Sequence, residues 1–352
     1  MCITAESGVG WLRGGAGVSF PDGGAGVGSD DGAGRSGAGG RSGWVRAGLL
    51  ALMVAGGAIL LLACSDSEGD GDGQAVEAVV PTLAAGRLHT CGLEADGTPH
   101  CWGSDLGGRS SPPEGLRLST ITAGSAHSCG LEADGTPHCW GSNGDGQSSP
   151  PEGLRLTTIA AGSAHSCGVE ADGTPHCWGD DDAGQSSPPD GLQFATIAAG
   201  GSFNCGLEAN GTPHCWGSDL RGQSSPPEGL RLSDISAFRT HACGLEADGT
   251  PRCWGEDARG QSSPPDGLRL TAIAVGVQHS CGLEADGTPH CWGGEGWMPF
   301  TPPDGLRLAT IAAGRSHICG LEADGTPHCW GDESEALASP PDGLLLSVPA
   351  DS

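Results

Sequence analysis

A single unit of 38 residues is repeated seven times along this chain of 352 residues. A cysteine and a tryptophan mark each copy, and both recur at this spacing without exception. The cysteines are Cys91, Cys129, Cys167, Cys205, Cys243, Cys281 and Cys319, and the tryptophans are Trp102, Trp140, Trp178, Trp216, Trp254, Trp292 and Trp330. A chain of this kind folds as an array of one supersecondary unit, in which each copy covers its apolar faces with its neighbours.

The second copy, residues 116–153, shows what one unit contains. Residues 116–123, 127–133 and 136–140 are short apolar and β-branched runs, and each predicts a β-strand. An Asp-Gly pair between the last two runs predicts a hairpin turn. The Gly- and Pro-rich residues 141–153 predict a linker to the next copy. The chain has 65 Gly and 25 Pro, which excludes a helical bundle because these residues break helix interiors.

Three antiparallel strands form a sheet that is too small to be stable alone. Seven such sheets arranged radially predict an all-β fold, a seven-bladed β-propeller with about three strands per blade. A linear solenoid is the competing architecture, but it needs atypical polar repeats at its ends, whereas the end copies here nearly match the middle ones. Residues 78–85 supply the first strand of the first copy, and residues 344–348 begin an eighth copy that nothing follows. We expect this spare segment to meet the first blade and close the ring. The sequence leaves open which of the two segments occupies which position.

The motif of the unit resembles that of a known repeat family. In the second copy it consists of Gly124, His127, Cys129, Leu131, Asp134, Gly135, Cys139, Trp140, Gly141, Gly146 and Gln147. These residues are similar to the repeat of the regulator of chromosome condensation family, and the resemblance covers residues 78–348. It implies a seven-bladed propeller. The short unit is most similar to the bacterial members, which include a propeller-type β-lactamase inhibitor protein.

The net charge of −27 belongs to the chain from Cys64 onward and not to the residues before it. Residues 1–63 contain four Arg and four acidic residues, so the excess charge lies in residues 64–352. This charge argues against nucleic acid as a partner, because nucleic-acid binding depends on Lys and Arg that neutralise phosphates. The role of the eukaryotic family members on chromatin is therefore not expected.

The N-terminal region is predicted to be an export signal. Residues 1–46 are a Gly-rich, disordered leader that ends in a basic region, residues 47–63 are apolar, and Cys64 follows directly. This order resembles the bacterial lipoprotein signal, in which the chain is cut before the cysteine and the cysteine carries the lipid. Residues 64–77 form an acidic, Gly-rich tether, and the propeller occupies residues 78–348. The alternative is an uncleaved signal anchor, since the apolar run is just long enough to span a membrane. Either interpretation predicts an exported protein.

Each copy has two cysteines with nine residues between them, centred on the hairpin turn. A three-residue turn with Gly135 in the left-handed conformation places Cys129 and Cys139 directly opposite each other, within reach of a disulfide. Because export leads to an oxidising compartment, we predict seven disulfides. They are Cys91–Cys101, Cys129–Cys139, Cys167–Cys177, Cys205–Cys215, Cys243–Cys253, Cys281–Cys291 and Cys319–Cys329. Of the two remaining cysteines, Cys2 is removed with the leader and Cys64 is lipidated.

Histidines close to these cysteines raise the alternative of zinc sites. All fourteen cysteine positions are kept, however, whereas the first histidine of the unit becomes Phe203 in the fourth copy and the second becomes Arg252 in the fifth. A metal site would not lose one ligand while the others stay, so the histidines are predicted to pack or hydrogen-bond between blades. Asp180, Asp181 and Asp182 form the densest acidic cluster, yet no loop offers the oxygens of a calcium site. We expect no metal and no cofactor.

The copies differ at a few positions, where function is expected to lie. Residues that depart from the repeat on three consecutive blades are Phe203, Phe238, Arg239, Trp297 and Phe300. Tracing the strands puts their loops on one face. Exposed aromatic residues beside an arginine are typical of a protein interface, so we predict a partner-binding patch. The alternative is drift of the repeat, with the phenylalanines packed between blades.

Together these features predict an exported, lipid-anchored β-propeller that acts as a monomeric protein-interaction module. Its place is the bacterial cell envelope, in the periplasm or at the surface, with the membrane reached through the lipid on Cys64. The alternatives are a proteinaceous enzyme inhibitor of the propeller β-lactamase-inhibitor type and a structural or glycan-binding surface module. An enzyme is not expected, because every candidate nucleophile occurs seven times as part of the scaffold.

Overall fold

The computed structural model describes residues 82–294, 300–332, 337 and 339–349. The chain divides into two units, Met1–Glu68 and Gly69–Ser352, and all the described residues belong to the second. The leader, apolar region, Cys64 and tether predicted over residues 1–77 lie outside the described residues, as does Trp297. The regular structure of the described part is entirely β-strand, and no helix in it is long and apolar enough to cross a membrane.

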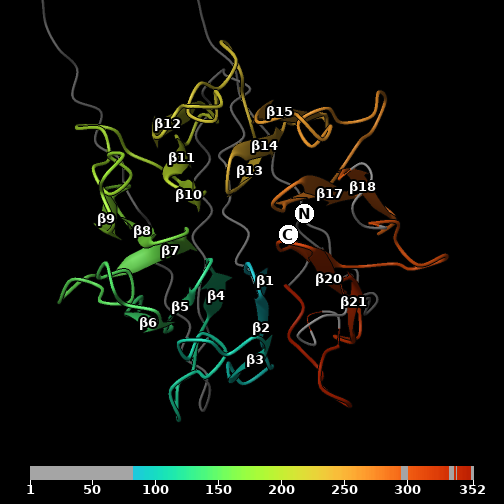
Figure 1. Ribbon diagram of the computed structural model, residues 1–352, viewed down its shortest axis with the longest axis horizontal. Helices are drawn as coiled ribbons and strands as arrows, with labels where there is room; N and C mark the ends of the chain where they lie inside the picture. Colours follow the sequence, from blue (N-terminus) through green and yellow to red (C-terminus); the bar gives the residue numbers. More distant parts are fainter. Residues whose placement is uncertain (1–81, 295–299, 333–336, 338, 350–352) are drawn as a thin grey trace, which may run out of the picture. The chain divides into compact units, whose positions relative to one another are not determined.

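Twenty-one strands form seven three-stranded antiparallel sheets, one for each copy of the repeat. The strands are β1 (Leu83–Ala85), β2 (His89–Leu93), β3 (Pro99–Gly103), β4 (Thr120–Ala123), β5 (His127–Leu131), β6 (Pro137–Gly141), β7 (Leu156–Ala161), β8 (His165–Glu170), β9 (Pro175–Gly179), β10 (Thr196–Ala199), β11 (Phe203–Leu207), β12 (Pro213–Gly217), β13 (Asp234–Phe238), β14 (His241–Leu245), β15 (Pro251–Gly255), β16 (Ala272–Val275), β17 (His279–Leu283), β18 (Pro289–Gly293), β19 (Thr310–Ala313), β20 (His317–Leu321) and β21 (Pro327–Gly331). The sheets follow one another around a ring (Figure 1), which confirms the predicted seven-bladed β-propeller.

The second and third strands of each blade are joined by the turn that the Asp-Gly pair predicts. In the second blade, Glu132 N donates to Thr136 O at 3.0 Å, and Gly135 N donates to Glu132 O at 2.9 Å. Gly135 has a φ of 81°, the left-handed conformation that glycine adopts at little cost. Asp134 Oδ1 accepts hydrogen bonds from the amide and the hydroxyl of Thr136, at 2.9 and 2.6 Å. The turn fixes the register of the two strands that carry the cysteines.

The first strand of the unit is shorter than predicted. In the second blade, regular pairing begins at Thr120. The residues before it bridge two blades instead. Leu118 N donates to Gly97 O of the first blade at 2.8 Å, and Ser119 N donates to Leu131 O of its own blade at 2.7 Å. The first strands lie at the centre of the ring, where each contacts the first strand of both neighbouring blades (Figure 1).

The apolar core lies between the blades. One cluster combines Cys129 and Leu131 of the second blade with Leu156, Ile159 and Trp178 of the third. Equivalent clusters join the other neighbours, including the seventh blade and the first. Since the apolar side chains of a blade are buried only against the next blade, each blade depends on both neighbours for its stability.

The C-terminal segment closes the ring. Ser347 N donates to Leu93 O of the first blade at 2.6 Å, a bond that the equivalent serine also makes in the second blade. Leu346 N donates to the hairpin of the seventh blade at 2.9 Å, so the segment joins the last blade to the first. It occupies the position that the repeat assigns to the residues before β1, where the sequence has Pro81. Proline has no N–H to donate, which explains why the end of the chain supplies this bond.

Candidate functional site

The fourteen cysteines of the repeat form seven disulfides, one in each blade. Cys129 and Cys139 face each other across β5 and β6, with their Cα atoms 4.0 Å apart. The other pairs, at 4.0 to 4.1 Å, are Cys91–Cys101, Cys167–Cys177, Cys205–Cys215, Cys243–Cys253, Cys281–Cys291 and Cys319–Cys329. This is the pairing predicted from the sequence. Because both sulfurs of each pair are bonded, none of these cysteines offers a thiolate to a substrate or a metal.

A polar network through the first histidine of the unit connects five of the seven blades to the next blade. His127 Nε2 lies 2.8 Å from Ser166 Oγ of the next blade. Ser166 Oγ donates its proton to Gln147 O at 3.0 Å, so the imidazole N–H donates to the serine. Trp178 Nε1 donates to the same carbonyl at 3.0 Å. The histidine is fully buried, and this burial lowers the pKa of His127 to about 4, so its ring is neutral at pH 7.

The same contact recurs around the ring, and its two exceptions explain departures from the repeat. It is formed by His89 with Ser128, His165 with Asn204, His241 with Ser280 and His317 with Thr90. Where Phe203 replaces the histidine, the next blade presents the apolar Ala242 in place of a hydroxyl. Where the next blade presents Ile318, His279 stacks on Phe300 with ring centroids 3.9 Å apart. Phe203 thus meets an apolar partner, whereas both ring nitrogens of His279 are buried without a hydrogen-bond partner among the described residues.

These contacts correct the prediction of an exposed aromatic patch. Phe203 has no exposed surface, and Phe238 and Phe300 are each only 9% exposed. Phe203 fills the place of a histidine. The carbonyl of Phe300 accepts the indole N–H of Trp330, a role that the Gly-Gln glutamine has in four other copies. Phe238 lies in the apolar cluster between the fifth and sixth blades. The phenylalanines thus belong to the core between blades. This is the packing that the alternative of repeat drift predicts. Arg239 is exposed.

The second histidine of the unit lies on the hairpin and faces a glutamate. His138 Nε2 is 2.9 Å from Glu132 Oε1. The arginine of the fifth copy keeps this contact, because Arg252 Nη2 is 3.1 Å from Glu246 Oε2. The acidic cluster also has a local role, since the carboxylate of Asp181 accepts hydrogen bonds from two serines of its own loop. Among the described residues there is no group of three His, Cys, Asp or Glu side chains arranged to hold a metal ion.

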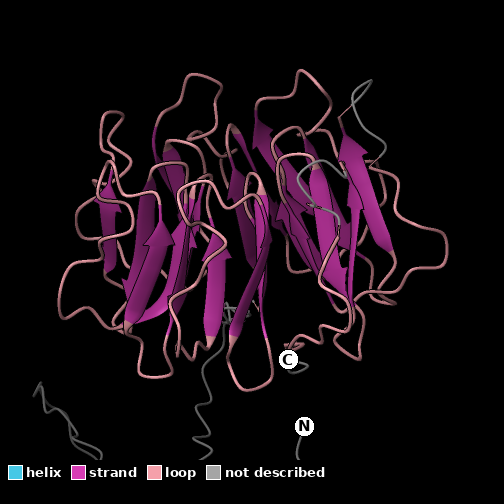
Figure 2. Cartoon of the chain, turned by 60° about the horizontal axis from the view of Figure 1, so that its bottom comes forward, coloured by secondary structure: helices cyan, strands magenta, loops and turns pink. Residues whose placement is uncertain are grey.

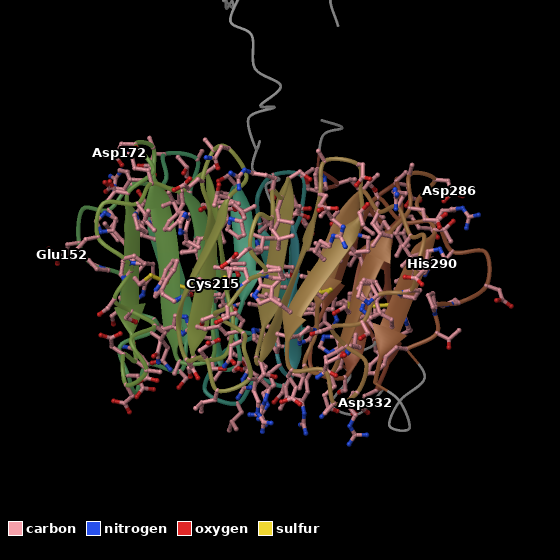
Figure 3. The ribbon with its side chains drawn as sticks, turned by 90° about the horizontal axis from the view of Figure 1, so that it is seen from above. Glu152, Asp172, Cys215, Asp286, His290 and Asp332 are labelled. Atoms are coloured by element: carbon pink, nitrogen blue, oxygen red, sulfur yellow. A yellow bond between two sulfur atoms is a disulfide. The ribbon has the colours of Figure 1, made fainter. Side chains whose placement is uncertain are left out.

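The two ends of the blades differ in how closely the copies repeat. The hairpin face, formed by the turns between second and third strands, reads Glu-Ala-Asp-Gly-Thr in six copies and Glu-Ala-Asn-Gly-Thr in the fourth. The opposite end, which we call the variable face, consists of the loops between first and second strands and the loops that follow the third strands. Figure 2 shows loops gathered at both ends of the strands. In Figure 3 the hairpin residues Asp172 and Asp286 lie at one end and Asp332 lies at the other.

The loops between first and second strands form an inner ring on the variable face. They are residues 86–88, 124–126, 162–164, 200–202, 239–240, 276–278 and 314–316. Neighbouring loops are joined by backbone hydrogen bonds, such as Arg87 N to Gly124 O at 3.1 Å and Gly201 N to Arg239 O at 3.0 Å. One position of the loop thus recurs around the axis in every blade. It is occupied by Arg87, Ser125, Ser163, Gly201, Arg239, Val277 and Arg315.

Three of these seven residues are arginines. The sequence-based prediction included Arg239 but missed Arg87 and Arg315, which become apparent when the seven copies are aligned at this position. Burial, and to a smaller extent the positive charges of Arg315, Arg239 and Arg109, lower the pKa of Arg87. Arg239 has a φ of 46°, and no other non-glycine residue of the described part has a positive φ.

A cleft of about 320 Å³ opens on the variable face beside Arg239. It lies between the inner loops of the third, fourth and fifth blades and the outer loop of the fourth. Its lining includes Ser163, Gly201, Leu220 and Arg221. The Leu220 side chain is 91% exposed. The cleft therefore combines hydroxyl groups, two guanidinium groups and one apolar side chain.

A rigid ring of disulfide-bonded blades with one uniform and one variable face defines a propeller scaffold that presents loops to a partner. Residues 119–147 and 156–185 match the family model of the regulator of chromosome condensation (RCC1) repeat. The remaining copies carry the same motif at the same spacing. The chain is a member of the RCC1-repeat family, and its fold indicates a protein-interaction module.

Solved structures of other proteins share this fold. The ectodomain of the Physcomitrella patens receptor kinase CR4 is 28% identical, with 71% of this chain and 73% of that chain covered and a TM-score of 0.62. The CRINKLY WD40 ectodomain of the Arabidopsis thaliana receptor kinase ACR4 is 25% identical, with 77% and 99% covered and a TM-score of 0.63. Yeast RCC1 (Prp20), solved bound to Kap60, is 15% identical, with 82% and 90% covered and a TM-score of 0.59, and shows the fold alone. A comparison with curated proteins finds no match.

Proposed function

We propose that the chain is an exported, lipid-anchored propeller that binds another protein through its variable face. The contrast between the two faces carries this proposal. Residues of the hairpin face are held by structural contacts: Gly135 O accepts the amide of Leu156 from the next blade at 2.9 Å, and Arg155 reaches Asp134 at 3.6 Å. The inner loops of the variable face are linked mainly through their backbone, so their side chains are free to differ between copies and to recognise a partner.

Export is supported by the seven disulfides, which are typical of proteins that fold in an oxidising compartment. Lipid anchoring is proposed from the position of Cys64 directly after an apolar run. We expect the native protein to partition into the detergent phase of a Triton X-114 extract and Cys64→Ala to partition into the aqueous phase. A Cys64→Ala variant that stays in the detergent phase would favour the signal anchor instead.

Site-specific cross-linking tests partner binding through the variable face. The photoreactive residue p-benzoylphenylalanine is placed in the full chain at Ser163 or Leu220, which line the cleft. The matched controls are Ala133 and Ala171, which are exposed on the hairpin face. Illumination of cells that produce the protein is expected to give a discrete adduct from the two cleft positions and none from the two hairpin positions. Adducts of equal yield from both faces, or from the hairpin face alone, would contradict the proposal.

A further inference from the structure

We propose that Arg87, Arg239 and Arg315 form the centre of a site for a narrow acidic segment of the partner protein, and that the cleft beside Arg239 holds the continuation of that segment. This inference rests on the proposed function and names the chemistry of the partner. It requires a protein of strongly negative net charge to bind another anionic group, which only a local cluster of positive charge allows.

The three arginines have no carboxylate partner among the described residues. Four arginines of the hairpin face, by contrast, each lie 3.4 to 3.6 Å from an aspartate, in the pairs Arg117–Asp96, Arg155–Asp134, Arg269–Asp248 and Arg307–Asp286. Arg87 Nε is buried and donates to no acceptor in the described part of the chain. A buried donor of this kind is rarely left unpaired in a folded protein, so its position points to an acceptor supplied by a ligand.

The arginines occupy one repeat position of the inner ring, in the first, fifth and seventh blades. Neighbouring loops of this ring are in contact, and the last meets the first, since a Cβ atom added to Gly314 would contact the carbonyl oxygen of Gly86. Burial lowers the pKa of Arg87, repulsion by the neighbouring arginines lowers it further, and an anion bound among the arginines would oppose both effects.

The backbone conformation of Arg239 indicates that its side chain has a role other than stabilising the fold. Its φ of 46° is a conformation in which an arginine is strained and a glycine is not. The equivalent glycine of the preceding blade, Gly201, does not have a positive φ, so the left-handed conformation is specific to the fifth blade. Strain at a single exposed residue persists where the side chain has a function that glycine cannot supply. Binding of an anionic group by the Arg239 side chain at the mouth of the cleft is such a function.

The rim of the variable face determines which anion fits. The outer loops, which follow the third strands and so lie outside the inner ring, carry the acidic residues Asp105, Asp181, Asp219, Asp257 and Asp332. A broad polyanion, such as a nucleic acid or an anionic membrane, would meet these carboxylates before it reached the centre. A loop or chain end of a protein passes between them, and the exposed Leu220 offers a contact for an apolar side chain beside the acidic ones.

The test measures binding of a fluorescein-labelled hexaglutamate peptide to the full chain in detergent at low salt, by fluorescence anisotropy. The triple variant Arg87→Gln, Arg239→Gln and Arg315→Gln is expected to bind about tenfold more weakly or worse, because charge-assisted contacts are lost. The matched control removes the same charge from the hairpin face with Arg117→Gln, Arg155→Gln and Arg307→Gln, and is expected to bind like wild type.

Arg239→Gly separates binding from folding. This variant relieves the backbone strain, so its thermal midpoint is expected to stay level or rise while peptide affinity falls severalfold. Arg239→Lys is expected to keep most of the affinity. Absence of peptide binding, or equal binding by wild type and the triple Gln variant, would overturn the inference.

Anionic vesicles and a short DNA duplex serve as competing probes. Preferential binding of either one, lost in the triple Gln variant, would overturn the assignment to a protein segment. Cross-links from the variable face that persist unchanged in the triple Gln variant would reject this site while leaving the proposed function intact.

Discussion

The first histidine of the unit is expected to make the stability of the propeller strongly dependent on pH. Burial lowers the pKa of five of these imidazoles to about 3 or about 4, namely His89, His127, His241, His279 and His317. In the unfolded chain the same groups titrate near pH 6.5. Between these values the unfolded chain binds more protons than the folded one, so stability is complete above about pH 6.5 and decreases as the pH falls.

The size of the effect follows from the number of buried rings. At about pH 5.5, one unit below the unfolded pKa, each neutral imidazole lowers the free energy of unfolding by about 1.4 kcal/mol relative to about pH 7.5. The five together lower it by about 7 kcal/mol, comparable with the whole stability of many domains, about 5–15 kcal/mol. Guanidinium unfolding followed by tryptophan fluorescence at the two pH values, without reductant, measures this loss.

A double variant isolates one histidine. His127→Phe with Ser166→Ala copies the joint that the protein already has between Phe203 and Ala242. It is expected to reduce the loss between the two pH values by about 1.4 kcal/mol, because one titrating group is removed without leaving its partner unpaired. The control, Ser166→Ala alone, is expected to lose about 1–3 kcal/mol at both pH values and to keep the pH dependence. A double variant with the wild-type pH dependence would refute the assignment of the acid sensitivity to these joints.

Three other changes test the ring itself. Removing one disulfide with Cys129→Ala and Cys139→Ala is expected to lower the free energy of unfolding by about 2–3 kcal/mol in denaturant titrations, and no loss would contradict its stabilising role. Ser347→Pro deletes the N–H that joins the chain end to the first blade and is expected to lower the thermal midpoint, whereas Ser347→Ala keeps it; equal midpoints would argue against closure by this segment. Arg252→His restores the residue of the other copies opposite Glu246, so its free energy of unfolding is expected to stay within about 0.5 kcal/mol of wild type, and a larger change would assign the guanidinium another role.

The repeat itself was enough to predict the blades and their disulfides. Both depend on contacts within one copy, where the spacing of Cys129 and Cys139 around an Asp-Gly turn determines the register. The pairing of Phe203 with Ala242 could not be predicted, because the two residues belong to different blades and meet only when the ring is closed. Without that pairing, a phenylalanine in place of a polar histidine indicated an exposed site.

The arginine cluster was missed for a related reason. Arg87 and Arg315 stand at opposite ends of the repeat array, and their proximity follows from closure of the ring and not from their separation in sequence. Ring closure also explains the C-terminal segment. Pro81 and Ser347 are equivalent positions of the repeat, and proline cannot donate the hydrogen bond that Ser347 makes, but only the structure shows this bond to the first blade.

The central claim is that the variable face of the propeller binds a partner, whereas the residues of the hairpin face make contacts that stabilise the ring. Hydrogen exchange of the native chain, with and without the partner captured by cross-linking, tests it most directly. Bound partner is expected to slow exchange in the inner and outer loops of the variable face, such as residues 200–202, 218–223 and 239–240, and to leave the hairpin turns, such as residues 132–136, unchanged. Protection of the hairpin turns with no change in the variable loops would contradict the claim.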